Sequence, residues 1–282
     1  MIWNKFTTHH NPLQDSSIKL LTSPFRAVYR HRSILRQTVQ NDLRARHAGA
    51  LLGFVWLVLQ PILFLGTYAF VYLYIFHIRI PGTSSGEYVA RIFCGLIPFL
   101  GFAEAINTGV NSLTNNANLI RKTLFPAEMI PVKAVLTAQV TQGVGTLILV
   151  LVLALMGHLS WWILLLPLLW WAHFMMTMGI VWILATANVF IRDLQSVTAI
   201  LTLVLMMVSP IAYTASMAPA SLQIILKLNP LYYIIVSYQE ILLAGRFPPH
   251  ETFWILLALS LLLFCFGYWF MNRLKNLFAE YV

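Results

Sequence analysis

The chain has 282 residues, of which 59% are hydrophobic and only 10% are charged, and its mean hydropathy is +0.77. A soluble domain carries about 25% charged residues, so this composition excludes an ordinary cytosolic enzyme, a disordered protein and a nucleic-acid-binding domain. The formal net charge is +9. These values are typical of a protein that crosses a membrane several times.

The N-terminal part of the chain is expected to lie outside the bilayer. Residues 1–24 lack an apolar core, which predicts a cytoplasmic tail and no signal peptide. An amphipathic helix in the cytoplasmic headgroup layer is predicted over residues 25–47. Its apolar residues recur at helical spacing and are Phe25, Val28, Leu35, Val39 and Leu43. The alternative is a basic juxtamembrane tail that only obeys the positive-inside rule.

Six stretches are apolar enough to cross a bilayer as helices, for which about 20 residues suffice. The 58 residues between Lys133 and Arg192 carry no formal charge, so two spans are expected there with a turn at 156–160. The sequence therefore predicts an all-α integral membrane protein with a transmembrane domain over residues 48–275 and a cytoplasmic tail at 276–282. The expected spans are about 51–77, 92–113, 131–156, 161–190, 195–214 and 252–272.

The basic residues predict the orientation of these spans. An even number of spans places both termini on one side, and 14 of the 18 Lys and Arg residues fall on that side. By the positive-inside rule this side is cytoplasmic. We therefore expect a multi-pass protein with both termini in the cytoplasm.

Two segments outside the spans carry further information. The cytoplasmic loop 114–128 exposes Leu119 and Phe125, which either a protein partner or the lipid interface must cover. The outer segment 216–250 is too long for a simple connection, and Asn229-Pro230 divides it. Two short re-entrant helices are predicted there, over residues 217–228 and 230–245.

Sequence signatures of catalysis are missing. No phosphate-binding loop and no zinc-binding helix motif occurs, and Cys94 and Cys265 both lie in apolar stretches. We therefore predict no enzyme activity and no catalytic, cofactor or metal site in this chain. Glu104 and Glu240 are acids at membrane depth, where an acid is a functional candidate by default. For Glu104 the alternative is a hydrogen bond to a neighbouring span.

Several short motifs follow one another in register with the six spans. They occupy residues 46–56 with Gln60-Pro61, 95–99 with Glu104, 118–122 with 125–128, 191–193, 209–213 and 228–231. Together they resemble the membrane subunits of polysaccharide-exporting ABC transporters over about residues 25–275. His47, Ala50 and Ala103 depart from the residues common in that family.

The resemblance implies a homodimer of this subunit, joined to two copies of a separate ABC ATPase that binds ATP and Mg. It implies the bacterial inner membrane as location and lipid-linked polysaccharide as cargo, with O-antigen, capsule and teichoic acid as the options. A secondary transporter would need more coupling acids and internal repeats. A membrane glycosyltransferase would need clustered carboxylates. The sequence has neither feature, so both rank as distant alternatives.

The candidate site residues fall into three groups. For docking to the ATPase they are Asn118, Leu119, Arg121, Lys122 and Phe125. For lipid phosphate they are Arg26, Arg30 and Arg36, and ordinary attraction to anionic lipid is the alternative for each. For a sugar pathway or gate they are Tyr68, Tyr72, Glu104, Tyr213, Tyr232, Tyr233, Tyr238 and Glu240, and for the tyrosines the alternative is an aromatic belt at the membrane interface.

Overall fold

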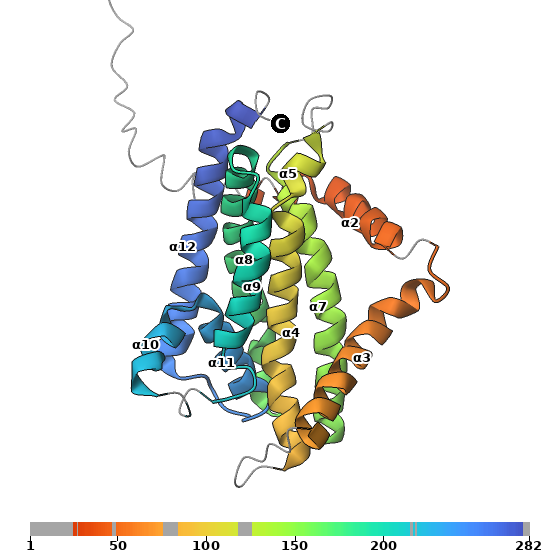
Figure 1. The fold of residues 1–282 in the computed structure, drawn as a ribbon, viewed down its shortest axis with the longest axis vertical. Coiled ribbons are helices and arrows are strands. Elements are labelled where there is room, and N and C mark those ends of the chain that lie inside the picture. Colours follow the sequence, from red (N-terminus) through yellow and green to blue (C-terminus); the bar gives the residue numbers. More distant parts are fainter. Residues whose placement is uncertain are drawn as a thin grey trace, which may run out of the picture.

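The computed structural model describes residues 25–26, 28–46, 49–75, 84–117, 126–214, 217 and 219–278, and every regular element in these ranges is helical. Long helices stand side by side in one bundle, with short helices near its two ends (Figure 1). The longest are α4 (Ser85–Gly109), α7 (Met129–Leu155), α8 (Leu166–Phe190) and α12 (His250–Leu274). The predicted all-helical fold is confirmed.

The two ends of the bundle differ in what they carry (Figure 1). One end, called the α5 end below, carries α5 (Ser112–Asn115) and η5 (Lys275–Leu277), with α2 (Arg32–Arg46) beside it. The other, called the α10 end, carries α10 (Ala220–Leu228) and α11 (Pro230–Leu242).

Four described helices are long and apolar enough to cross a membrane. They are Ser85–Gly109, Met129–Leu155, Trp161–Phe190 (η3, Trp161–Leu165, followed by α8) and His250–Leu277. Two shorter apolar helices accompany them: α3 (Trp56–Phe70), which follows η1 (Gly53–Val55), and α9 (Leu194–Val208). A π-helical turn, η2 (Val71–Ile75), continues α3.

Local sequence signals explain where two of these helices begin and end. α4 starts at Ser85, ahead of the predicted start at 92, because Ser84 and Glu87 form a reciprocal capping box. α9 ends at Val208, short of the predicted end at 214, because Pro210 disfavours helical geometry in the residue before it.

The tightest contact in the bundle joins α8 to α12. A Cβ atom added to Gly179 would lie 2.2 Å from the carbonyl oxygen of Leu263, and one added to Gly267 would lie 2.2 Å from that of Gly179. The two backbones therefore touch, as small residues permit between membrane helices. Next to this contact the buried ring of Trp182 packs on Phe264, with ring centroids 5.2 Å apart.

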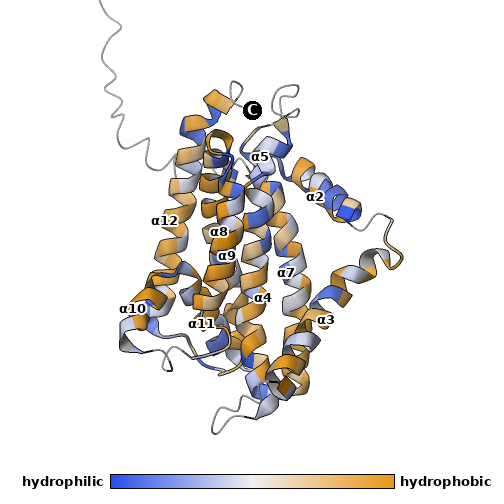
Figure 2. Ribbon diagram, in the orientation of Figure 1, coloured by the Kyte–Doolittle hydropathy of each residue, from blue (hydrophilic) through white to orange (hydrophobic). Residues whose placement is uncertain are grey.

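α3 and α9 expose most of their apolar surface. α3 buries none of its residues, and α9 buries only Thr198 and Thr202. Hydrophobic residues dominate both helices and the outside of α12, whereas hydrophilic ones gather on α2 and around α5 (Figure 2). The outer surface of the bundle is thus suited to lipid or to a second apolar protein surface.

Candidate functional site

α2 turns its apolar stripe toward the bundle. Leu35 and Val39 are buried, and α2 packs against α7. Arg36 and Arg44 are exposed, as are Arg26 and Arg30 ahead of this helix. The predicted interface arginines therefore lie at the surface, where phosphate groups could reach them.

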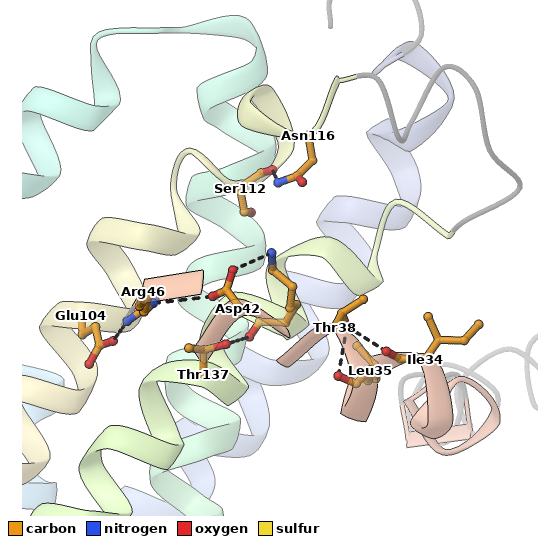
Figure 3. Close-up of polar contacts among 10 residues, drawn as sticks. Ile34, Leu35, Thr38, Asp42, Arg46, Glu104, Ser112, Asn116 and Thr137 are labelled. Atoms are coloured by element: carbon orange, nitrogen blue, oxygen red, sulfur yellow. Dashed lines mark hydrogen bonds and ion pairs between the residues drawn. The ribbon is translucent and has the colours of Figure 1, made fainter. Parts of the chain in front are cut away.

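A chain of ion pairs attaches the end of α2 to two long helices (Figure 3). The guanidinium of Arg46 donates to the carboxylate of Glu104 on α4. It also lies 3.6 Å from Asp42, one turn earlier on α2, and Asp42 accepts from the ammonium of Lys133 on α7 at 3.1 Å. All four side chains are between 22% and 33% exposed, so each pair is partly shielded from water. The carboxylate of Glu104 is thus neutralised by a residue of α2.

A further ion pair lies at the same end of the bundle. The ammonium of Lys275 in η5 lies 3.4 Å from the carboxylate of Glu128, which immediately precedes α7. The backbone carbonyl of Glu128 also accepts a hydrogen bond of 3.1 Å from the indole of Trp182 on α8. The start of α7 is therefore tied to the last turn of the chain's C-terminal helical segment.

The predicted ATPase-docking residues Asn118, Leu119, Arg121, Lys122 and Phe125 lie outside the described residues. The chain on both sides of them is described and belongs to the α5 end. On the near side Asn116 donates its amide to the carbonyl of Ser112 at 2.8 Å. On the far side α7 begins at Met129.

At the α10 end, side chains from α4, from α11 and from the residue between α10 and α11 hold the bent segment that follows α9, residues 209–214. The hydroxyl of Tyr88 on α4 donates to the carbonyl of Ala212 at 3.1 Å. The amide of Gln239 on α11 donates to the carbonyl of Pro210 at 3.0 Å. Asn229, between α10 and α11, donates to the hydroxyl of Ser209 at 2.9 Å. These three hydrogen bonds hold the segment between α9 and α10.

The predicted pathway tyrosines occupy different environments. Tyr233 and Tyr238 on α11 are buried inside the bundle, at 9% and 1% exposure. Tyr232 is half-buried and meets Tyr233 edge-on, with centroids 5.3 Å apart. Tyr213 is half-buried and donates to the carbonyl of Val208. Of these four, Tyr232 and Tyr233 contact each other, and all four belong to α11 or to the segment after α9.

The two tyrosines predicted in the first span lie on a separate element. Tyr68 on α3 is half-buried and packs against Phe64, with the rings tilted and their centroids 4.8 Å apart. The side chain of Tyr72 lies outside the described residues. Tyr68 therefore lies on a different element from the other predicted pathway tyrosines described above.

Glu240 forms an ion pair close to its own helix. Both carboxylate oxygens accept from the guanidinium of Arg246, one of them at 3.0 Å from Nη2. The hydrogen bonds and charge of Glu240 raise the pKa of Arg246 above its usual value. The second predicted intramembrane acid is thus also neutralised.

In the described part of the chain no cluster of His, Cys, Asp and Glu could hold a metal ion.

Comparison with known proteins identifies the family to which the chain belongs. The pattern of the ABC-2 type transporter family matches residues 34–243, from α2 to the end of α11. The chain belongs to the ABC-2 type transporter family. The match ends before α12, which the tight contact with α8 joins to the rest of the bundle.

Three relatives show how far this similarity extends. The chain is 29% identical to the O-antigen export system permease protein RfbA of Myxococcus xanthus, over 90% of this chain and 97% of the relative. It is 30% identical to a Klebsiella pneumoniae protein of the same name, over 85% and 91%. It is 26% identical to the polysialic acid transport protein KpsM of Escherichia coli, over 72% and 79%.

Sequence reasoning missed several residues that organise this ABC-2 type chain. Asp42 and Lys133 are 91 residues apart in the sequence, and they meet only because α2 packs against α7. Tyr88 and Gln239 hold the segment after α9. The position of Asp42 on the predicted amphipathic helix was the one available signal, because it is the single acid in that basic helix.

We expect the pair between Arg46 and Glu104 to stabilise the attachment of α2. Arg46→Gln leaves Glu104 without its partner, whereas after Glu104→Gln the guanidinium keeps Asp42 as a partner. Arg46→Gln should therefore lower the thermal unfolding midpoint more, with a loss of roughly 1 kcal/mol. The measurement is thermal unfolding of the purified protein at low and high salt.

The double variant provides the sharper comparison. If the two residues act through each other, Arg46→Gln with Glu104→Gln together should cost no more than Arg46→Gln alone. Arg44→Gln is the matched control, since this exposed arginine lies on the same helix. Fully additive losses, or an equal loss in the control, would contradict the assignment.

Proposed function

We propose that this chain is the transmembrane subunit of an ATP-driven exporter that moves lipid-linked polysaccharide across the bacterial inner membrane. O-antigen is the favoured cargo and capsular polysaccharide the second candidate. The chain itself carries no catalytic site in this proposal, and ATP and Mg are bound by a separate ATPase.

The observation that carries the proposal is end-to-end similarity to a named exporter subunit. The relative from Myxococcus xanthus is covered over 97% of its length, so no separate domain of it remains unmatched. Two relatives named for O-antigen export each match a larger share of this chain than KpsM does, and KpsM is named for polysialic acid transport. This difference favours O-antigen over capsule.

The proposal includes six spans with both termini in the cytoplasm. From Trp56 to Ile75, α3 and η2 form a continuous helical stretch of about 30 Å, which matches the thickness of the hydrocarbon core. α9 is shorter, and the bent segment 209–214 follows it at the α10 end. The α5 end is then cytoplasmic, which agrees with the basic residues of α2.

A homodimer would cover the surfaces that one subunit leaves open. Gln60 is exposed on the apolar helix α3, and its amide has no hydrogen-bond partner in the part of the chain that the structure describes. A polar side chain at membrane depth is commonly satisfied across a helix–helix contact. α9 also exposes most of its apolar side chains. These features support contacts of α3 and α9 with a second copy.

The ATPase partner, present in two copies, is proposed to dock on the loop 114–128 through Asn118, Leu119, Arg121, Lys122 and Phe125. Apolar side chains on an aqueous loop favour a protein contact. The flanking residues belong to the same end of the bundle as the ion pairs of α2 and α7. A push on this loop would therefore act directly on α7.

Cargo contacts are proposed at both ends of the bundle. At the α5 end the exposed guanidinium groups of Arg26 and Arg30 suit phosphate oxygens of the cargo lipid, whereas Arg36 is assigned to ordinary anionic lipid. At the α10 end α10 and α11 would form the outer gate. Of the four predicted pathway tyrosines there, the half-buried Tyr213 and Tyr232 are accessible, since Tyr233 and Tyr238 are buried. Aromatic faces can pack against sugar rings without a fixed hydrogen-bond pattern.

The test is export in proteoliposomes that contain the full chain and its cognate ATPase. Wild-type protein should move lipid-linked O-antigen only when ATP, Mg and the ATPase are all present. Leu119→Asp and Phe125→Asp should abolish ATP-dependent export, because a buried carboxylate costs several kcal/mol at a docking contact.

Two results separate the parts of this proposal. Export by the chain without any ATPase, or with an ion gradient as the energy source, would contradict the ATP-driven function. Normal export by the two loop variants, with undiminished ATPase pull-down, would contradict only the docking assignment. Leu277→Asp, at an exposed position of η5 at the α5 end, is the control for adding a charge.

A further inference from the structure

A groove of about 480 Å³ runs between α2 and α7. Its volume falls in the range of sites that hold small molecules. The exposed polar side chains of its lining are Arg32, Arg36 and Gln40 from α2, and they are called its mouth below. Its walls are apolar apart from one amide, and they are formed by Val28, Leu35, Val39, Leu43, Leu136, Gln139 and Val140.

The amide in the wall, that of Gln139, has no partner among the residues that the structure describes. Its side chain is 6% exposed, and neither its nitrogen nor its oxygen makes a hydrogen bond there. A buried polar group left unsatisfied costs about 1–3 kcal/mol. Because Gln139 lines the groove, a molecule with ester or phosphate oxygens could accept the hydrogen bond that the protein does not use.

The mouth of the groove is positively charged and open to an anion. Arg36 is exposed and makes no ion pair within the described part of the chain. Arg32 donates to the backbone carbonyl of Tyr29 at 3.2 Å and lies over the ring of that tyrosine. The single acid of α2, Asp42, is occupied by Lys133 and Arg46.

A polar hollow lies directly beside the apolar groove. It measures about 530 Å³ and is lined by Ser33 and Gln37, together with the same three residues that form the mouth of the groove. An apolar groove that shares two arginines with a hollow lined by polar residues matches a molecule with a hydrocarbon chain and an anionic head.

We propose that this groove binds an anionic phospholipid of the surrounding bilayer. The phosphate lies on Arg32 and Arg36, the amide of Gln139 donates to an ester oxygen, and one acyl chain lies against Leu35 and Leu136. The lipid fills the gap between α2 and α7. Bilayer phospholipid is present at far higher concentration than any lipid-linked cargo, so mass action favours it in a site that recognises this chemistry. The proposal does not depend on the cargo that the protein exports.

The experiment measures lipids retained by the full-length protein purified in mild detergent. After incubation with phosphatidylglycerol, native mass spectrometry should find one lipid held per chain, and phosphatidylcholine should be held about tenfold more weakly. Arg36→Gln and Gln139→Leu should each weaken retention of phosphatidylglycerol about tenfold. Arg44→Gln removes the same charge from the same helix outside the groove and should leave retention unchanged.

Thermal stability gives a second readout. Phosphatidylglycerol should raise the unfolding midpoint of the wild-type protein and of Arg44→Gln, but not that of Arg36→Gln. Arg36 is exposed, so its variant tests the site even if Gln139→Leu fails to fold. Equal retention by Arg36→Gln and Arg44→Gln, or equal retention of the two phospholipids, would overturn the proposal. Displacement of phosphatidylglycerol by an equal concentration of a polyprenyl diphosphate would also overturn it, because the groove would then belong to the cargo.

Discussion

Replacing Gly179 with alanine is expected to force α8 away from α12 and to remove most of the folded protein from the membrane. The added Cβ would lie 2.2 Å from the carbonyl oxygen of Leu263 and 2.6 Å from the backbone nitrogen of Phe264. These atoms belong to a helix backbone and cannot rotate away, so the clash should cost about 3 kcal/mol, the upper end of the usual over-packing penalty. The measurement is the yield of monodisperse protein and its thermal unfolding midpoint.

Two further alanine variants make this prediction specific. Gly267→Ala meets the same contact from the α12 side and should lose a similar amount, and the double variant should lose less than the sum. Gly66→Ala is the control, since no described atom outside the backbone of α3 lies within 4 Å of the added Cβ. Alanine favours a helix over glycine by about 1 kcal/mol, so the control should be neutral or stabilised. Wild-type stability in Gly179→Ala would contradict the backbone contact.

Crosslinking α11 to its copy across the proposed dimer is expected to arrest export completely. Tyr232, Val236 and Glu240 are spaced one turn apart and are partly exposed, so they share the face of α11 that a second subunit could reach. In a background without Cys94 and Cys265, Val236→Cys should form an interchain disulfide on oxidation. A closed outer gate would then block a sugar chain, whereas ATPase binding at the α5 end should persist.

The neighbouring position supplies the control for this gate. Ile235 is fully buried in the bundle, so Ile235→Cys should neither crosslink nor change export. Reduction of the Val236→Cys disulfide should restore export. Undiminished export with the crosslink fully formed would reject the gate, and failure of all three exposed positions to crosslink would place the dimer axis elsewhere.

The predicted gate residues illustrate a limit of sequence reasoning. α11 is apolar on most of its surface, so hydropathy does not indicate which of Tyr232, Tyr233 and Tyr238 faces the bundle. The structure buries Tyr233 and Tyr238 and leaves Tyr232 half-exposed. That difference follows from the packing of α11 against α4 and α12, which depends on residues far away in the chain.

The predicted role of Glu104 shows a related limit. The position of an acid in an apolar stretch identified it as unusual, because a charge at membrane depth is costly without a partner. Its partner, Arg46, lies 58 residues earlier and was one of many arginines in a basic region. Arg46 becomes the partner of Glu104 only because α2 packs against α7, which places the end of α2 beside α4.

Composition and local pattern were sufficient to determine that this protein is an all-helical membrane protein. They were also sufficient for the apolar stripe of α2 and for the break at Asn229-Pro230 between α10 and α11, whereas the packing of that stripe on α7 came from the structure. These properties depend on hydropathy, on the 3.6-residue period and on proline stereochemistry, which act over a few residues. The tertiary structure alone decided the contact of Gly179 with α12, the pair of Asp42 with Lys133, and the groove beside Gln139. Each of these needs two helices at a specific distance and rotation, and that geometry comes from the packing of the whole bundle rather than from either segment.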